Sequence, residues 1–210
     1  MSPHPTTPTS TTPTRHDRRQ LLHEQQRLEQ GRARRRRWYL LAGGLLGLIL
    51  VAAGLWSAVP RSQDVSGPAP DFTLSTTAGD QVTLSALRGR PVILYFNEGA
   101  GCGSCTLQMA EIEKNPGFAQ AGITVLPIVM NTADQIRPDL EQYGVTTPYL
   151  LDDGTVSEAY GVLGAGMHEG LPGHGFVLID AAGIQRWYGN YPSMWLDPQE
   201  LLDEATKRLG

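Results

Sequence analysis

Residues 91–105 read PVILYFNEGAGCGSC and contain both cysteines of the 210-residue chain. The run Pro91–Phe96 is continuously apolar and rich in β-branched and aromatic residues, which is typical of a strand buried on both faces. The following segment, Cys105–Lys114, carries apolar residues among polar ones and predicts a helix. The sequence therefore places Cys102 and Cys105 where a buried strand passes into a helix.

This position gives the Cys-X-X-C pair its expected chemistry. Free backbone N–H groups and the positive end of the helix dipole stabilise an anion at the start of a helix, which favours the Cys102 thiolate. Cys105 lies one turn further on, close enough to attack a mixed disulfide formed by Cys102. We therefore predict a redox-active pair, with Cys102 and Cys105 as catalytic residues and with no cofactor.

The pair has three alternative uses. A structural disulfide would close a very small loop, and chain-entropy stabilisation grows with loop length. Half a zinc site would need His168 and His174 to complete it, and both lie more than sixty residues away. A copper site made of Cys102, Cys105 and His174 fits the ligand chemistry better, because soft thiolates suit Cu(I).

The rest of the chain from residue 69 alternates short strands and helices. Two hairpins are expected, Asp71–Ser75 with Gln81–Leu84 and Phe176–Asp180 with Gln185–Tyr188. The other expected elements are a second buried strand and three further helices, Ile123–Met130, Ala133–Tyr143, Val156–Tyr160 and Pro198–Leu209. This order predicts an α/β fold with a mixed central sheet and helices on both of its faces.

Several short motifs support a family resemblance. They are APDFTL at 69–74, VTLS at 82–85, LRGRPVILYF at 87–96, the Cys-X-X-C pair, and FVLID at 176–180 followed by Gly183. With these motifs the chain resembles the redoxin (AhpC/TSA-type) thioredoxin-like domains over roughly residues 69–208. The resemblance implies a thioredoxin-like fold with an N-terminal β-hairpin extension.

Two branches of that family are compatible with the sequence. Membrane-anchored thiol–disulfide oxidoreductases, such as those serving cytochrome c maturation, share a single anchor, an extracytoplasmic domain and a Cys-X-X-C pair. They usually carry Trp-Cys-X-Pro-Cys, where this chain has Gly101 and Ser104 in place of Trp and Pro. Peroxiredoxins require a Thr within P-X-X-X-T-X-X-C, where this chain has Tyr95 and Gly99 instead of Pro and Thr. The departure from the peroxiredoxin motif at Tyr95 and Gly99 favours thiol–disulfide exchange over peroxide reduction.

The oxidoreductase branch also implies supporting residues. Its members place a cis-proline before the strand that faces the cysteines, so that here either Pro172 or His174 takes this position. A His174 ring facing Cys102 would stabilise the thiolate and pass protons, or bind copper as a His does in the related Sco-type chaperones. The alternative is a loop histidine in contact with water. Glu98, four residues before Cys102, is a further candidate for proton relay.

Residues 38–59 read WYLLAGGLLGLILVAAGLWSAV and carry no charge. As a helix the segment would span roughly 33 Å, which predicts a transmembrane anchor. Its length and the 37 residues before it argue against the alternative of a cleaved signal peptide. Arg32 and Arg34 to Arg37 precede it and a lone Arg61 follows it, so the N-terminus is expected in the cytoplasm and residues 60–210 outside it.

Charge is distributed unevenly between the two ends of the chain, and this predicts how the remaining segments are organised. Residues 1–37 carry nine Arg against three acids and predict a disordered, basic cytoplasmic tail. Residues 60–68 are expected to form a linker, and residues 69–210 the thioredoxin-like domain. Residues 60–210 hold eight Lys or Arg against eighteen acids, which argues against a nucleic-acid partner.

Together these features predict a single-pass protein of the cell membrane whose extracytoplasmic domain is a thiol–disulfide oxidoreductase. The expected partners are protein thiols and disulfides near the membrane, a membrane electron-transfer partner, and the membrane itself through one helix. The alternatives are a thiol peroxidase, or a Cu(I)-binding chaperone that uses Cys102, Cys105 and His174.

Overall fold

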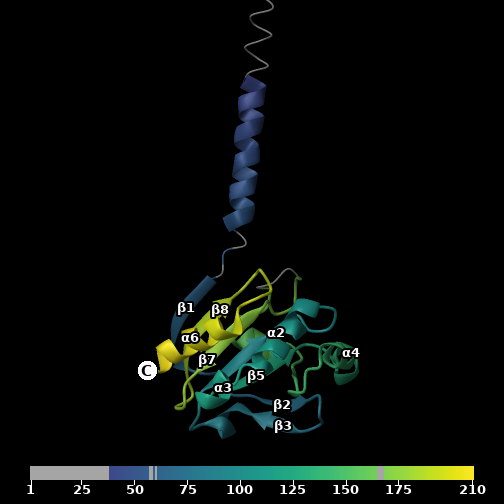
Figure 1. The fold of residues 1–210 in the computed structure, drawn as a ribbon, viewed down its shortest axis with the longest axis vertical. Helices are drawn as coiled ribbons and strands as arrows, with labels where there is room; N and C mark the ends of the chain where they lie inside the picture. The colour runs from purple at the N-terminus through teal and green to yellow at the C-terminus, as the bar shows by residue number, and fades with distance from the viewer. Residues whose placement is uncertain (1–37, 57–58, 60, 165–167) are drawn as a thin grey trace, which may run out of the picture. The chain divides into compact units, whose positions relative to one another are not determined.

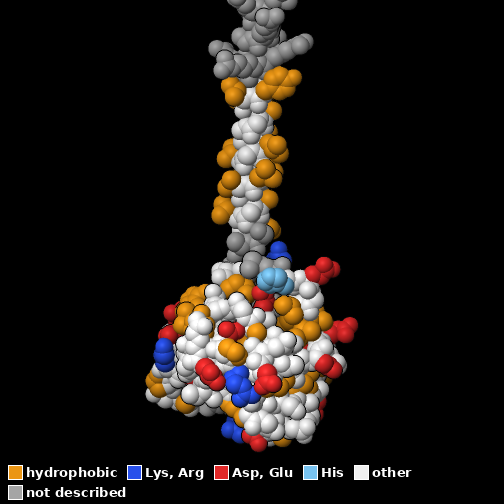
Figure 2. All heavy atoms as spheres, turned by 90° about the vertical axis from the view of Figure 1, so that its right-hand side faces the viewer, with side chains coloured by type: hydrophobic (Ala, Val, Ile, Leu, Met, Phe, Trp, Pro, Cys, Tyr) orange, Lys and Arg blue, Asp and Glu red, His pale blue; other side chains and the backbone are white. Residues whose placement is uncertain are grey.

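The computed structural model describes residues 38–56, 59, 61–164 and 168–210, and it divides the chain into two compact units after Leu55. The predicted basic tail, residues 1–37, lies outside the described residues. The N-terminal helix Trp38–Trp56 is long and apolar enough to cross a bilayer, and its side chains are exposed. Figure 2 shows hydrophobic side chains along this helix, whereas the folded unit carries acidic and basic side chains on its surface.

The folded unit is built on a mixed sheet of eight strands in the order β1-β8-β7-β4-β5-β6-β2-β3. The strands are β1 (Arg61–Pro68), β2 (Thr73–Thr76), β3 (Gln81–Thr83), β4 (Val92–Phe96), β5 (Thr124–Val129), β6 (Leu150–Leu151), β7 (Gly175–Ile179) and β8 (Ile184–Asn190). The helices are a 3₁₀ helix η1 (Leu84–Leu87), α2 (Gly103–Lys114), α3 (Gly117–Gln120), α4 (Ala133–Tyr143), α5 (Thr155–Ala159) and α6 (Pro198–Leu209). Parallel pairs join β4, β5 and β6, whereas the other neighbours are antiparallel.

The central strand β4 is buried along its whole length, as its apolar run predicts. Successive side chains of a strand point to opposite faces, and β4 follows this rule: Ile93 and Tyr95 join one core cluster, and Leu94 and Phe96 join the other. The first cluster includes residues of α2, α3, α4 and α6, and Figure 1 shows α2, α3 and α6 over one face of the sheet. The second includes Leu84 of η1 and Val156 of α5. The predicted thioredoxin-like α/β fold is confirmed.

Local sequence signals fix the helix ends next to the site. Thr132 and Gln135 form a capping box at the start of α4, and Gly144 ends the helix in the left-handed conformation with φ of 69°. Asp197 accepts hydrogen bonds from the first turn of α6, which begins with Pro198. Both helices therefore have the bounds that the sequence predicts.

The predicted linker 60–68 is wrong, because residues 61–68 form strand β1. This strand pairs antiparallel with β8 from Arg61↔Asn190 to Pro68↔Ile184. Its sequence RSQDVSGP has no apolar alternation and most of its side chains are exposed, so the backbone pairing holds it in place. An ion pair from Arg208 of α6 to Asp64, at 2.7 Å, adds a tertiary contact. The sheet of the folded unit thus begins at Arg61, inside the segment that was expected to be a linker.

Candidate active site

The two cysteines form a disulfide at the start of α2, with their Cα atoms 5.3 Å apart. Cys102 is the N-cap residue of the helix and is half-buried, whereas Cys105 is 0% exposed. The carbonyl of Cys102 accepts hydrogen bonds from the backbone N–H groups of Cys105 and Thr106. Of the two cysteines in the disulfide, Cys102 is therefore the one that another molecule can reach.

An open cavity of about 500 Å³ lies beside Cys102. Its lining includes the loop before α2, together with Glu98, His168, Leu171 and Met194. Among the non-glycine residues that the structure describes, Met194 alone has a positive φ, 59°. Backbone strain of this kind persists where surrounding structure imposes it, and it is frequent at functional sites. The cavity and its strained wall mark the face at which a partner could reach Cys102.

Glu98, which was a sequence candidate because it lies near Cys102 in the chain, lines this cavity. Its Oε2 atom is 2.7 Å from Nδ1 of His168, and the side chains are 5% and 64% exposed, respectively. The pair joins the loop after β4 to the segment before β7. The structure thus brings Glu98, His168 and Cys102 to one cavity.

His174 is placed differently. It directly precedes β7 and is 0% exposed, so it is not a loop histidine in contact with water. The Tyr95 hydroxyl donates to the Cys105 carbonyl at 3.0 Å, so its oxygen accepts from the His174 ring, whose Nδ1 is 3.1 Å away. The other ring nitrogen lies 3.4 Å from Oε1 of Gln108. His174 therefore supports the dithiol helix from inside the core, through Tyr95.

Pro172 sits in an isolated bridge with Leu163 and is buried. Every peptide bond in the described ranges is trans, so Pro172 does not form the cis peptide that the oxidoreductase branch implies. His174 takes the position immediately before the strand. Over the same ranges, no three His, Cys, Asp or Glu side chains are grouped so that they could hold a metal ion.

The buried state of His174 leads to a prediction about acid stability. Burial lowers the pKa of His174 to about 3 from its ordinary value of 6.5. Below pH 6.5 the unfolded chain binds a proton that the folded chain does not, so the free energy of unfolding falls as the pH falls toward 3. This loss approaches about 1.4 kcal/mol per pH unit.

We expect His174→Gln to remove that part of the pH dependence. The free energy of unfolding is measured by chemical denaturation between pH 6.5 and 5, where most carboxylates stay ionised. His168→Gln is the matched control, because the His168 side chain is exposed. Equal pH slopes in wild type and His174→Gln would contradict the assignment.

Sequence reasoning missed the residues that shape the loop before Cys102. Asn131 follows β5 and accepts from the Ala100 N–H at 2.8 Å, and Asp139 of α4 accepts from the Gly101 N–H at 2.8 Å. Tyr143, one turn after Asp139, lies so close to Gly103 that a Cβ there would be 2.3 Å from its hydroxyl oxygen. Asn131 could have been found from the sequence. It follows β5, the cysteine loop follows β4, and the carboxyl ends of neighbouring parallel strands lie side by side.

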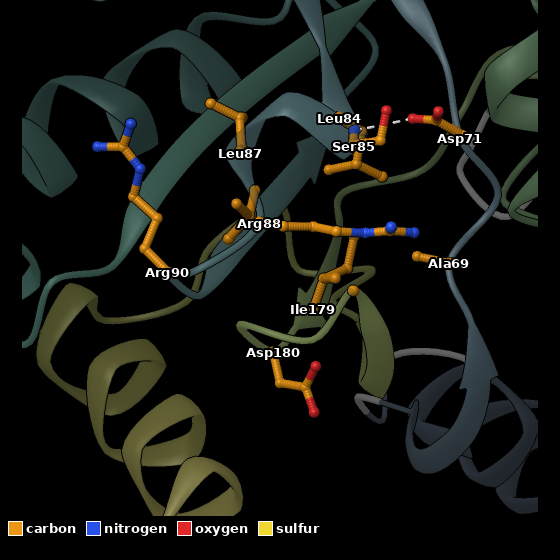
Figure 3. Close-up of a pocket in the computed structure, with 11 residues that line it drawn as sticks. Ala69, Asp71, Leu84, Ser85, Leu87, Arg88, Arg90, Ile179 and Asp180 are labelled. Carbon is orange, nitrogen blue, oxygen red and sulfur yellow. Dashed lines mark hydrogen bonds between the residues drawn. The ribbon is translucent and has the colours of Figure 1, made fainter.

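A smaller cavity of about 20 Å³ lies at the other end of β4, near Val92 and Ile179 (Figure 3). Figure 3 shows Asp71 bonded to the backbone N–H of Ser85, a distance of 2.9 Å. The space holds about one water molecule. Because the cysteines follow the opposite end of β4, this cavity has no part in the dithiol site.

The fold and the disulfide define the class of this protein, a thiol-based oxidoreductase with a thioredoxin-like domain. The sequence profile of the AhpC/TSA family matches residues 65–188, and the chain belongs to this family.

Two proteins of similar sequence are named as peroxiredoxins. A putative peroxiredoxin of Mycobacterium tuberculosis is 37% identical over 98 residues, 46% of this chain and 62% of that protein, so the match spans less than two thirds of the relative. Peroxiredoxin Q of Oryza sativa subsp. japonica is 29% identical over 165 residues, 75% of this chain and 74% of its own.

Solved structures with a similar fold include both disulfide oxidoreductases and peroxiredoxins. A putative protein disulfide isomerase from Bacteroides thetaiotaomicron superposes with a TM-score of 0.54 at 27% identity, over 69% of this chain and 89% of that one. A secreted Mycobacterium tuberculosis disulfide oxidoreductase homologous to E. coli DsbE has a TM-score of 0.51 at 22% identity, over 65% and 95%. Peroxidoxin BcpB from the same organism gives 0.57 at 21%, over 70% and 96%. The last two likenesses concern the fold alone.

Proposed function

We propose that this protein is a membrane-tethered thiol–disulfide oxidoreductase that acts outside the cytoplasm on disulfides of other proteins. The observation that carries the proposal is the unequal placement of the two sulfurs at the start of α2. Cys102 borders an open cavity, and Cys105 is buried directly behind it. A nucleophile needs access, whereas a resolving thiol needs only to reach its neighbour.

The reaction follows from this arrangement. The Cys102 thiolate attacks one sulfur of a substrate disulfide, forms a mixed disulfide and releases the other substrate sulfur as a thiolate. Cys105 then loses its proton and attacks Cys102, which releases the second substrate thiol and leaves Cys102–Cys105 oxidised. Two electrons and two protons pass to the substrate. Glu98 and His168 line the same cavity and are assigned the exchange of these protons.

The cellular location in the proposal rests on the N-terminal helix. The helix Trp38–Trp56 is consistent with a membrane anchor or a signal sequence. The five Arg of residues 32–37 favour an uncleaved anchor with a cytoplasmic N-terminus. A membrane dithiol donor would then return two electrons to the oxidised pair. Trp195, next to the cavity residue Met194 and 39% exposed, offers an aromatic contact for a polypeptide substrate.

A thiol peroxidase is the second candidate, favoured by the sequence relatives that are named peroxiredoxins. Two observations weigh against it. The peroxiredoxin Thr is Gly99 here, with φ of 79°, and a Cβ at this position would lie 1.8 Å from Oδ1 of Asn131. The backbone N–H groups of the same loop are also bonded within the protein, which leaves them unable to bind a peroxide.

Parallel assays on the full chain in detergent test the proposal. With dithiothreitol as electron donor, we expect turnover of insulin disulfides that depends on Cys102, and no hydrogen peroxide consumption above a Cys102→Ser control. Peroxide turnover without disulfide exchange would replace the proposal with the peroxidase. Absence of both activities would overturn it.

A further inference from the structure

The loop before Cys102 has an unusual hydrogen-bonding state. Four consecutive backbone N–H groups, those of residues 99 to 102, are all donated to acceptors within the protein. The bonds are Gly99 N–H to Asn97 Oδ1 (3.0 Å), Ala100 N–H to Asn131 Oδ1 (2.8 Å), Gly101 N–H to Asp139 Oδ2 (2.8 Å) and Cys102 N–H to the Gly99 carbonyl (3.0 Å). None of these four donors is left to stabilise a negative charge on the Cys102 sulfur.

One of these acceptors is a carboxylate. Asp139 lies on α4, half-buried, and its oxygen is bonded to the residue immediately before Cys102. Tyr143 follows it by one helical turn and approaches Gly103, so this face of α4 is held against the dithiol loop on both sides of Cys102. The carboxylate is thus held against the residue that precedes Cys102, and it cannot move away without breaking its hydrogen bond to the Gly101 N–H.

The charge acts differently on the two redox states. The disulfide is neutral, whereas the reduced pair carries a thiolate on Cys102 in part of the molecules near neutral pH. A nearby negative charge disfavours the thiolate and leaves the disulfide unaffected. Because reduction potential depends on how well the reduced form is stabilised, the pair should become a stronger reductant.

We propose that Asp139 is a positioning residue that lowers the reduction potential of the Cys102–Cys105 pair and so shifts its equilibrium toward reduction of partner disulfides. The inference rests on the proposed function and adds a residue outside the Cys-X-X-C pair that tunes its reduction potential. The dithiol gives two electrons and two protons to a partner disulfide, becomes the disulfide, and is reduced again by a dithiol donor.

The test is the equilibrium of the full chain in detergent with the dithiothreitol couple at pH 7.5 and low salt. Asp139→Asn keeps an acceptor oxygen for Gly101 and removes the charge. We expect the equilibrium to shift about two- to fivefold toward the reduced protein, the range typical of partly exposed charge interactions. For a two-electron couple this is about 10 to 20 mV. The shift should shrink in 1 M NaCl, where the charge is screened.

Asp134→Asn is the matched control, because Asp134 lies on the same helix, is exposed and pairs with Arg137 at 3.0 Å. It should leave the equilibrium at the wild-type value. Equal equilibria for wild type and Asp139→Asn, or equal shifts for both variants, would overturn the inference. If Asp139→Asn does not fold, the wild type alone decides: raising NaCl from 50 mM to 1 M should favour its reduced form, and an unchanged equilibrium would refute the role of charge.

The two proposals fail in different ways. If Asp139 has no effect while the wild type still reduces insulin, only the inference about Asp139 is lost. If the wild type equilibrates with dithiothreitol but never exchanges with a protein disulfide, the proposed function is lost, and the effect of Asp139 on the potential remains measurable.

Discussion

Cys102→Ser is expected to abolish disulfide exchange with protein substrates, a loss of roughly a thousandfold or more, because a hydroxyl supplies no thiolate to begin the reaction. Cys105→Ser should retain the first attack and stop there, because nothing remains to release the substrate. This variant should therefore accumulate a mixed disulfide through Cys102. Turnover is followed with insulin, and the trapped adduct by mass spectrometry.

Ser104→Ala is the matched control for both substitutions. Ser104 lies between the cysteines and is exposed, and its loss leaves both sulfurs in place. It should keep activity within a few-fold of wild type. Disulfide exchange by Cys102→Ser at more than a tenth of the wild-type rate would contradict the assignment, as would full turnover by Cys105→Ser.

Gly99→Ala should strongly destabilise the fold. The φ of Gly99, 79°, is costly for any residue with a Cβ, and that Cβ would lie 1.8 Å from Oδ1 of Asn131. Asn131 would have to move and would lose its bond to the Ala100 N–H. We expect a loss of about 2 to 4 kcal/mol in the free energy of unfolding, measured by denaturation of the oxidised protein.

Gly122→Ala separates the two causes of this loss. Gly122 has a similar φ of 68°, and an added Cβ would meet nothing within 4 Å. Its substitution should cost only about 1 kcal/mol, from backbone strain alone. If Gly99→Ala costs no more than Gly122→Ala, the close packing of Asn131 against the loop is not what stabilises the loop.

Gly99→Thr should likewise fail to create a peroxidase, because the loop has no room for the threonine.

Much of the fold was predictable because its signals are local. The buried strand β4 follows from six consecutive apolar residues, and α4 follows from a Thr132 cap and a terminal Gly144. Such signals act over a few residues, so they can be read before the tertiary structure is known. The antiparallel hairpin of β2 and β3 was similarly indicated by its turn residues.

Strand β1 could not be predicted from local signals. Residues 61–68 carry no apolar pattern, and the strand exists because β8 offers an unpaired edge to its backbone. An edge of this kind is formed by the whole sheet, so it has no trace in the sequence of β1 itself. A stretch that looks like a linker becomes part of the domain for this reason.

The candidate site also has one part that local sequence signals predict and another part that depends on the whole fold. The cysteine pair and its place at the start of a helix were predictable from neighbouring residues. The contact of His174 with Tyr95 joins positions 79 residues apart and depends on the pairing of β4 with β7. The bond from Gly101 to Asp139 spans 38 residues and depends on how α4 packs against α2. Neither of these two contacts could be predicted without the fold.

Alkylation of the reduced protein tests most directly whether Cys102 is the sulfur that meets other molecules. The full chain is reduced with dithiothreitol, freed of reductant and exposed briefly to limiting iodoacetamide, and the modified peptides are quantified by mass spectrometry. The buried position of Cys105 predicts that Cys102 is modified at least about tenfold faster. Modification of Cys105 first, or of both cysteines at equal rates, would contradict the account.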